Sequence, residues 1–424
     1  MQLSTDEQAM LRGDRGLPVK EAIEFQIAIG DFFGAERFVP ISNAHMMGDI
    51  EVMGDAGLAR LQQMAEGGAR CAIGITTNAR CIDFDHVASL GQIEDEAQKE
   101  RRIIAHLRQM NVITADTCIN YQTLYQPHLG EHVAWGDTGT VIYANSVFGA
   151  RTNFEGGPSA LASAITGRTP AYGFHLDAVR RGNLVVELDV DPSDYADWGA
   201  IGKLVGEPNQ SYYAVPVFTN VRRAPTSDEL KHLGAALASY GSHAMFHMVG
   251  VTPEAPSVEA ALGGNTPTSV MKITRADIDR VYRSYDVKDG RCNLVVFSAP
   301  QLSLFELKRI SELLDGRQVA AGSKLFVTTS NAMKRTASEL GYIGRIEAAG
   351  GIVLEGVCFY ILQNLSPIKQ AMGWSSLVTN SAKLVNTITA HRFNTILRRT
   401  EDCIATALSG NVSQDSSRQP GAER

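Results

Sequence analysis

"CNLVVFSAPQLSLFELKRISELLDG", residues 292–316, carries the alternation that decides the fold. The apolar run 294–297 has the length and β-branched composition of a buried strand. A helical pattern follows, opened by Ser303 and Glu306 at capping-box spacing and closed by Gly316. The polar residues 298–301 between strand and helix indicate a short loop. A strand that leads directly into a helix predicts an α/β unit.

The same alternation recurs along the chain. Strands are expected at 37–41, 71–77 and 112–119, and helices at 19–33, 56–69 and 94–110. This pattern predicts an α/β fold with parallel or mixed sheets flanked by helices. Because 424 residues exceed one ordinary core, we expect several subdomains. We divide the chain into a first part at 1–290, a second α/β subdomain at 291–410 and a polar, disordered tail at 411–424.

Composition narrows the range of partners. The net charge of −7 argues against a nucleic acid or an anionic membrane surface. The sequence has no apolar run of about 18 residues and no basic-then-apolar leader, so we expect a cytoplasmic protein. Six cysteines spread over this length do not suggest a disulfide framework. In a reducing compartment they are buried apolar groups, metal ligands or reactive thiols.

Polar stretches lie next to the expected strands. In parallel sheets ligands bind outside the carboxyl ends of strands, so loops of similar polar character suggest one shared site. The stretches are 42–49, 76–81, 117–121, 143–175, 298–301, 355–358 and 378–383.

The long stretch 143–175 combines several kinds of polar group. Asn145, Ser146 and Arg151 supply donors suited to a carboxylate or hydroxyl group, and Glu155 supplies an acid or base. A well-bonded surface loop with an ion pair between Arg151 and Glu155 explains the same residues equally well. Residue types alone do not decide between a binding site and such a loop.

Four segments together resemble a known family. They are "GEHVAWGDTGTVIYANSVFGARTNFEGGPSALASAITGRTPAYGFH" (130–175), "GDAGL" (54–58), "GAALASYGSHAMFHMVGVTPEA" (234–255) and "VTNSAK" (378–383). The chain, from about residue 3 to residue 408, closely resembles aconitase X, a divergent branch of the aconitase superfamily. The resemblance implies an aconitase-like, multi-subdomain hydro-lyase with an iron-sulfur cluster. It also implies a small swivelling domain, and since this chain resembles the large subunit alone, we expect that domain as a separate small partner subunit.

The cluster ligands implied by the resemblance are Cys118, the loop at 298–301 and Cys358. Where relatives commonly show Gly-Cys-Pro, this chain has Ser298, Ala299 and Pro300, and alanine cannot bind iron. Several explanations of the missing cysteine stay open, and the nuclearity of the cluster stays open with them. Cys81 could supply a third thiolate, Ser298 could ligate weakly, the cluster could have fewer protein ligands, or a mononuclear metal or none could replace it. The other cysteines, Cys71, Cys292 and Cys403, are expected to be structural.

Further roles follow from the resemblance. The substrate-contacting loops of the family match His45, Gly48, Asn78 and Ala79, although His45 could be a packing histidine. Lys383 and Arg151 are candidate partners of a substrate carboxylate. Ser381 lies where aconitase-type enzymes keep a base, and Glu155 is the other candidate.

The resemblance implies dehydration of a small hydroxy acid, with iron as the Lewis acid. The characterised substrates are cis-3-hydroxy-L-proline in bacteria and mevalonate 5-phosphate in archaea. Asp49 and Glu51 would repel a phosphate, which favours cis-3-hydroxy-L-proline and its product 1-pyrroline-2-carboxylate. The alternatives are the large subunit of a mevalonate 5-phosphate dehydratase and a non-catalytic homologue that binds a small acid or a subunit.

Overall fold

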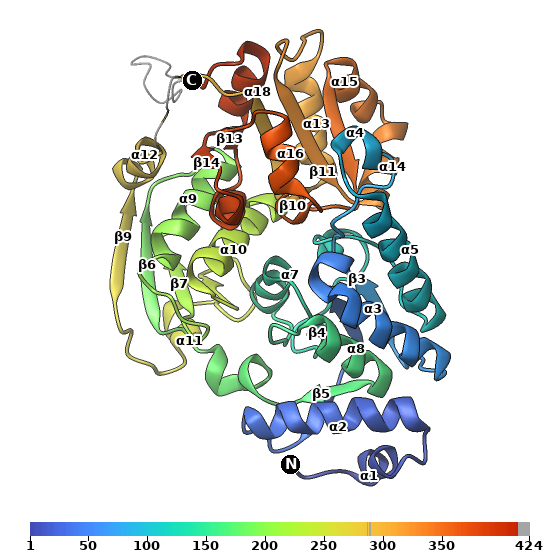
Figure 1. Ribbon diagram of the computed structural model, residues 1–424. Coiled ribbons are helices and arrows are strands. Elements are labelled where there is room, and N and C mark those ends of the chain that lie inside the picture. Colours follow the sequence, from blue (N-terminus) through green and yellow to red (C-terminus); the bar gives the residue numbers. More distant parts are fainter. Residues whose placement is uncertain (286, 288–289, 414–424) are drawn as a thin grey trace.

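Three parallel sheets form the frame of the protein in the computed structural model, which describes residues 1–285, 287 and 290–413 (Figure 1). The first sheet has the order β3-β2-β4. Its central strand β2 (Asn43–Met46) pairs in parallel with β3 (Gly74–Thr77) and β4 (Ala134–Trp135). The N-terminal segment adds a small antiparallel pair, β1 (Phe38–Pro40) with β5 (Arg168–Pro170).

The second sheet has the order β8-β7-β6-β9. It contains β6 (Leu184–Asp189), β7 (Pro216–Thr219), β8 (His247–Met248) and β9 (Val270–Thr274), all parallel. In Figure 1 this sheet and its helices, coloured green to yellow, form one side of the molecule.

The third sheet has five parallel strands in the order β12-β11-β10-β13-β14. They are β10 (Leu294–Leu302), β11 (Lys324–Thr329), β12 (Gly351–Glu355), β13 (Ser376–Thr379) and β14 (Asn394–Leu397). Strand β10 is buried along its whole length, as a central strand between two layers should be.

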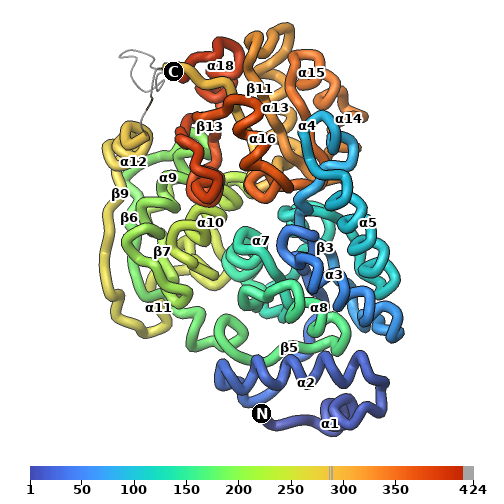
Figure 2. Tube along the Cα trace, in the orientation of Figure 1, coloured from blue at the N-terminus to red at the C-terminus, as the bar shows by residue number. Residues whose placement is uncertain are grey.

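Helices cover these sheets and connect them. The ones used below are α2 (Leu17–Phe32), α3 (Ile50–Glu66), α5 (Glu94–Gln109), α6 (Asn120–Thr123), α7 (Thr138–Tyr143), α8 (Gly157–Thr166), α9 (Tyr195–Gly206), α10 (Ser227–Gly241), α13 (Leu304–Leu314) and α17 (Ala382–Thr387). Each of the three large sheets, with the helices that cover it, forms one domain, and the domains are numbered as the sheets are. Helix α10 touches all three, because it contacts α9 of the second domain, α7 of the first, and α17 and β10 of the third. In Figure 2 α10 lies on the inner side of its domain, facing the middle of the molecule.

The predicted fold class is confirmed, with parallel sheets flanked by helices. The helices expected at 19–33 and 94–110 correspond to α2 and α5, and the Ser303/Glu306 capping box opens α13. The strand expected at 112–119 is wrong: only Ile113 forms a bridge, with Thr76, before the chain turns at Asp116, whose φ is 50°. Residues 298–301 belong to β10 rather than to a loop, at the place where its pairing with β11 is irregular.

Two further expectations concern membrane-spanning helices and the C-terminal tail. None of the helices that the structure describes is long and apolar enough to cross a membrane. Of the predicted tail at 411–424, residues 414–424 lie outside the described residues, while Asn411 forms an antiparallel bridge with Arg291.

Candidate active site

A buried ion pair joins the first domain to the third. Asp137 follows β4 and caps α7, where its Oδ2 accepts the N–H of Gly139 at 2.9 Å. Lys383 lies in the first turn of α17, and its Nζ is 3.3 Å from Oδ1 of Asp137. The two side chains are 5% and 6% exposed, so this is a largely desolvated pair.

The environment of Lys383 keeps its ammonium charged. Burial alone would lower the pKa of Lys383, but the Asp137 carboxylate, with a smaller effect from Tyr360, raises it above its ordinary value. A fixed cation at this position can hold a substrate carboxylate.

Two thiols approach the same segment of β10 from different loops. Sγ of Cys118 accepts the backbone N–H of Gln301 at 3.2 Å, and Sγ of Cys358 lies 3.9 Å from Oγ of Ser298. Ala299 lies between these two contact points and is buried. Burial raises the pKa of Cys118 to about 12 and that of Cys358 to about 11, with the charge of Lys383 opposing the shift at both thiols.

The donor set at this place decides which metal group it could hold. Iron-sulfur clusters are held directly by thiolates. Among the described residues, no group of three or more His, Cys, Asp and Glu side chains has the arrangement of a metal site, and Ala299 occupies the position on β10 between the residues that contact the two thiols. The residues present therefore do not fit a cluster held by three protein thiolates.

Cys81 lies in a different environment. Its side chain belongs to the core around β2, α3 and α5, whereas Cys358 and Ala299 share the core of the third sheet. Burial raises the pKa of the Cys81 thiol, and the carboxylates of Asp49 and Glu100 raise it further. These neighbours disfavour a thiolate, so the surroundings of Cys81 give no support to its predicted role as a third ligand.

His45 and Asn78 carry buried polar atoms without a partner. Nδ1 of His45 lies 2.8 Å from Oγ1 of Thr76. Nε2 of His45 and Oδ1 of Asn78 form no hydrogen bond of ordinary geometry with the residues that the structure describes, although the Asn78 side chain lies near enough to His45 to raise its pKa slightly. Burial lowers the pKa of His45 to about 4, although the Asp137 carboxylate opposes the shift, so the imidazole is neutral at pH 7. Unpaired polar atoms in a buried place are expected to meet a ligand or water.

A pocket of about 440 Å³ opens beside the Lys383–Asp137 pair. Its size suits a small molecule. Lys383 is the one basic side chain among the described residues that line it, and the acidic ones are Asp137 and Glu155. The remaining lining residues are Met47, Thr138, Phe154, Gly156, Ala238, Ser239, Ser242, Tyr360, Asn386 and Thr387.

Three predicted substrate contacts do not line this pocket. Asn145 donates to the carbonyls of Thr152 and Ala244, and Ser146 Oγ accepts the N–H of Phe246. Arg151 pairs with Asp177 and donates to the carbonyl of His175. These side chains bond to the chain itself. Asn145 and Ser146 are buried, and Arg151 pairs with Asp177 rather than with Glu155, so the structure does not show the surface-loop alternative either.

The two predicted catalytic residues differ in their surroundings. Oγ of Ser381 donates to the carbonyl of Ala299 at 2.5 Å and accepts the N–H of Leu384, so it caps α17. Glu155 lines the pocket and accepts a hydrogen bond from Oγ1 of Thr169 at 2.9 Å. Burial raises the pKa of Glu155, which brings its carboxyl closer to the range useful for proton transfer.

The last two predicted contacts, Gly48 and Ala79, flank the site. Gly48 adjoins Met47, which lines the pocket. Ala79 is buried in the same apolar cluster as Cys358. Neither offers a polar side chain, so each can act only through its backbone or through packing.

Sequence reasoning missed Asp137, Tyr360 and Gln301. Asp137 follows a strand of only two residues, too short for any periodic signal. Its signal was available in "WGDTGT", where an acidic residue stands before a Thr-Gly-Thr turn. Gln301 lies within the polar stretch 298–301, and Tyr360 stands two residues after the stretch 355–358, but nothing in their residue type marks them as site residues.

Comparisons with known proteins agree with this architecture. Models of the first, second and third domains of aconitase X match residues 1–178, 182–283 and 292–409. The phosphomevalonate dehydratase large subunit of Methanothermobacter thermautotrophicus is 37% identical over 385 residues, which cover 91% of this chain and 93% of that protein. The cis-3-hydroxy-L-proline dehydratase of Pseudomonas aeruginosa is 30% identical over 384 residues, which cover 90% of this chain and 65% of that protein.

The solved structures include a match over nearly the whole chain. The crystal structure of the holo-form of Thermococcus kodakaraensis aconitase X has a TM-score of 0.85 and 32% identity, and the match covers 96% of this chain and 100% of that chain. Together with relatives that are named dehydratases, this agreement in sequence and fold assigns both family and reaction class. The chain belongs to the aconitase X family and is a dehydratase, that is, a hydro-lyase.

Proposed function

We propose that this chain is the large, catalytic subunit of a dehydratase that converts cis-3-hydroxy-L-proline to 1-pyrroline-2-carboxylate. The observation that carries the proposal is the charge of the pocket. One lysine, Lys383, faces two acidic residues, Asp137 and Glu155. A cyclic imino acid matches this arrangement, because its carboxylate pairs with the ammonium group and its cationic nitrogen lies near the carboxylates.

A phosphorylated substrate fits these charges less well. Mevalonate 5-phosphate carries a carboxylate and a phosphate, and phosphate sites usually use several cationic or backbone N–H donors. Mevalonate 5-phosphate remains the second candidate, supported by the 37% identity to a phosphomevalonate dehydratase large subunit and by the 93% of that protein covered.

The pocket residues suggest how a proton leaves carbon. Lys383 would hold the substrate carboxylate and offset its charge, which makes the adjacent C–H more acidic. Glu155 and Tyr360 line the pocket and can exchange a proton without breaking the Lys383–Asp137 pair. Burial raises the pKa of both groups, so Tyr360 is a protonated donor at pH 7. We assign Glu155 as the base at C2 and Tyr360 as the donor to the leaving hydroxyl, so that water leaves and a C2=C3 enamine forms. A proton shift from nitrogen to C3 then gives 1-pyrroline-2-carboxylate.

A small partner subunit completes this proposal. The relatives that the chain covers almost fully are named large subunits, whereas the hydroxyproline dehydratase is longer and only 65% of it is covered. We propose that a separate small subunit supplies the small swivelling domain of the enzyme.

Turnover of both candidate substrates tests the proposal. The chain would be produced with its small subunit, purified anaerobically, and assayed with cis-3-hydroxy-L-proline and with mevalonate 5-phosphate. We expect kcat/KM for the imino acid to exceed that for the phosphate by about 100-fold or more, as for a site built around the charges of one substrate. Faster turnover of mevalonate 5-phosphate would replace this proposal with the second candidate.

A further inference from the structure

Gln301 lies at the point where all three domains meet. It is fully buried in β10 of the third domain. Its hydrogen bonds reach the Cys118 loop of the first domain, the Cys358 loop of the third, and Lys231 on α10 of the second. We propose that Gln301 is a positioning residue that fixes both site thiols, and that Lys231 anchors it. This inference rests on the prediction from the family resemblance that Cys118 and Cys358 are residues of the active site of the proposed dehydratase.

Two reciprocal hydrogen bonds hold the Cys118 loop. The backbone N–H of Gln301 donates to Sγ of Cys118 at 3.2 Å, and the backbone N–H of Cys118 donates to Oε1 of Gln301 at the same distance. A sulfur atom and its own backbone amide are thereby fixed by one residue, which leaves the thiol little freedom to turn.

The amide nitrogen of Gln301 connects this loop to the other one. Nε2 donates to the carbonyl of Asp116 at 3.2 Å and to the carbonyl of Val357 at 3.2 Å. Asp116 precedes Cys118 by two residues, and Val357 directly precedes Cys358. One side chain therefore sets the spacing of the backbone segments that carry the two thiols.

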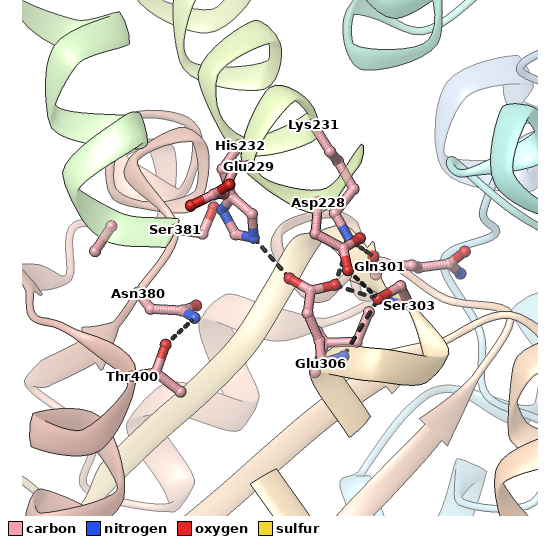
Figure 3. A network of polar contacts seen from close by, with 12 residues as sticks. Asp228, Glu229, Lys231, His232, Gln301, Ser303, Glu306, Asn380, Ser381 and Thr400 are labelled. Atoms are coloured by element: carbon pink, nitrogen blue, oxygen red, sulfur yellow. Dashed lines mark hydrogen bonds and ion pairs between the residues drawn. The ribbon is translucent and has the colours of Figure 1, made fainter. Parts of the chain in front are cut away.

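Lys231 holds Gln301 from the second domain. Its Nζ donates to the carbonyl of Gln301 at 3.3 Å, and the lysine side chain is fully buried (Figure 3). Its charge is balanced by an ion pair with Glu306 on α13 and by Asp228 at 3.3 Å. Burial alone would lower the pKa of Lys231, but these carboxylates raise it, so the donor stays charged.

Only a primary amide satisfies this set of contacts. The N–H, the C=O, Oε1 and both hydrogens of Nε2 are used, so no polar group of Gln301 is left over. Glutamate has the same size but only acceptors when ionised, and it would face the carbonyls of Asp116 and Val357. The change Gln301→Glu thus removes the two Nε2 donations that join the loops, while it preserves the volume and the two hydrogen bonds with Cys118.

Site-resolved thiol reactivity tests the clamp. Under native conditions the rate of alkylation by iodoacetamide would be measured for each cysteine by mass spectrometry of its peptide. In Gln301→Glu we expect Cys118 and Cys358 to react at least about 10-fold faster relative to the buried Cys403, as expected when buried hydrogen bonds are lost. A milder variant, Gln301→Asn, keeps the amide but shortens its reach, and it should change the same two rates in the same direction.

Gln26→Glu is the matched control. Gln26 is also buried, and its Nε2 also donates twice, to Oγ of Ser163 and to the carbonyl of Arg168. In this variant the alkylation rates of Cys118 and Cys358, each divided by the rate of Cys403, should equal those of the wild-type protein. Equal acceleration of all cysteines in Gln301→Glu, or no acceleration of Cys118 and Cys358 in either Gln301 variant, would overturn the positioning role.

The readout separates the two proposals. Alkylation requires no substrate, so selective exposure of Cys118 and Cys358 in an enzyme that dehydrates neither candidate substrate would support the clamp and remove the proposed function. Turnover of cis-3-hydroxy-L-proline at unchanged kcat by Gln301→Glu, with unchanged alkylation, would support the function and remove the clamp.

Discussion

Replacement of Lys231 by methionine should be among the most destabilising single changes in this protein. Lys231 is fully buried, and its ammonium pairs with Glu306 and Asp228. Methionine has a similar volume, so the change leaves little cavity, but it leaves two carboxylates buried without their cation. Removal of one partner from a buried ion pair costs about 3–5 kcal/mol, because an uncompensated charge stays behind.

The cost of Lys231→Met should depend on pH in a defined direction. In the wild-type protein burial alone would raise the pKa of Glu306, but Lys231, together with a hydrogen bond from His232, lowers it to about 2. A depressed pKa contributes stability above the ordinary pKa of a carboxyl group, and this contribution is lost as pH falls toward 2. Without Lys231, burial dominates and raises the pKa of Glu306, so protonation relieves the penalty in mild acid. The difference in stability between the two proteins should therefore be largest near pH 7 and shrink toward pH 5.

Urea unfolding followed by tryptophan fluorescence at several pH values measures this difference. Lys308→Met is the control, because Lys308 lies on the same helix as Glu306 and forms an exposed pair with Glu312. An exposed pair of this kind contributes about 0.3–0.5 kcal/mol. The reasoning fails if Lys231→Met costs no more than Lys308→Met, or if its cost grows as the pH falls.

Three further changes test the site. Lys383→Met should lower kcat/KM by about 100-fold or more, since it removes the cation expected to hold the substrate carboxylate; steady-state kinetics of the chain purified with the proposed small subunit measure this. Gly157→Ala places a Cβ 2.1 Å from the carbonyl oxygen of Met47. It should cost about 1–3 kcal/mol in urea unfolding, as overpacking does, and raise KM because Met47 lines the pocket. Ala299→Cys restores the cysteine that relatives commonly carry at this position of β10, so iron and sulfide bound per chain after anaerobic reconstitution should rise; unchanged values would contradict the role assigned to this position.

The sequence alone led to the segments that the structure brings together around the site. Cys118, Cys358 and Lys383 were singled out in loops beside expected strands and by the family resemblance. The structure places the charge of Lys383 close enough to influence both thiols. The physical reason is general, because the carboxyl ends of parallel strands meet at one edge of a sheet. The strand expected at 112–119 shows the limit of this reasoning, since Cys118 reaches the site from an irregular segment.

The stretch 143–175 shows what composition cannot decide. Asn145 and Arg151 looked suited to a ligand, yet their donors are used by backbone carbonyls and by Asp177. A buried polar group must be paired, but its type does not say whether the partner is a ligand or the chain itself. Gln301 shows the reverse case, a residue with a proposed role at the site that the sequence did not predict. Its hydrogen bonds join four segments that lie far apart in the sequence and meet only in the folded chain.

Helix α10 explains why buried charges are retained at this interface. An apolar contact between helices would be at least as stable as a buried ion pair, but it would tolerate sliding. Hydrogen bonds from Lys231 to Gln301, and from Asn386 on α17 to Ser239, fix α10 against two elements of the third domain. The same helix lines the pocket with Ala238 and Ser239. A shift of α10 would therefore move both the pocket wall and strand β10, which contacts the two thiols. The buried ion pair of Lys231 makes such a shift costly in free energy.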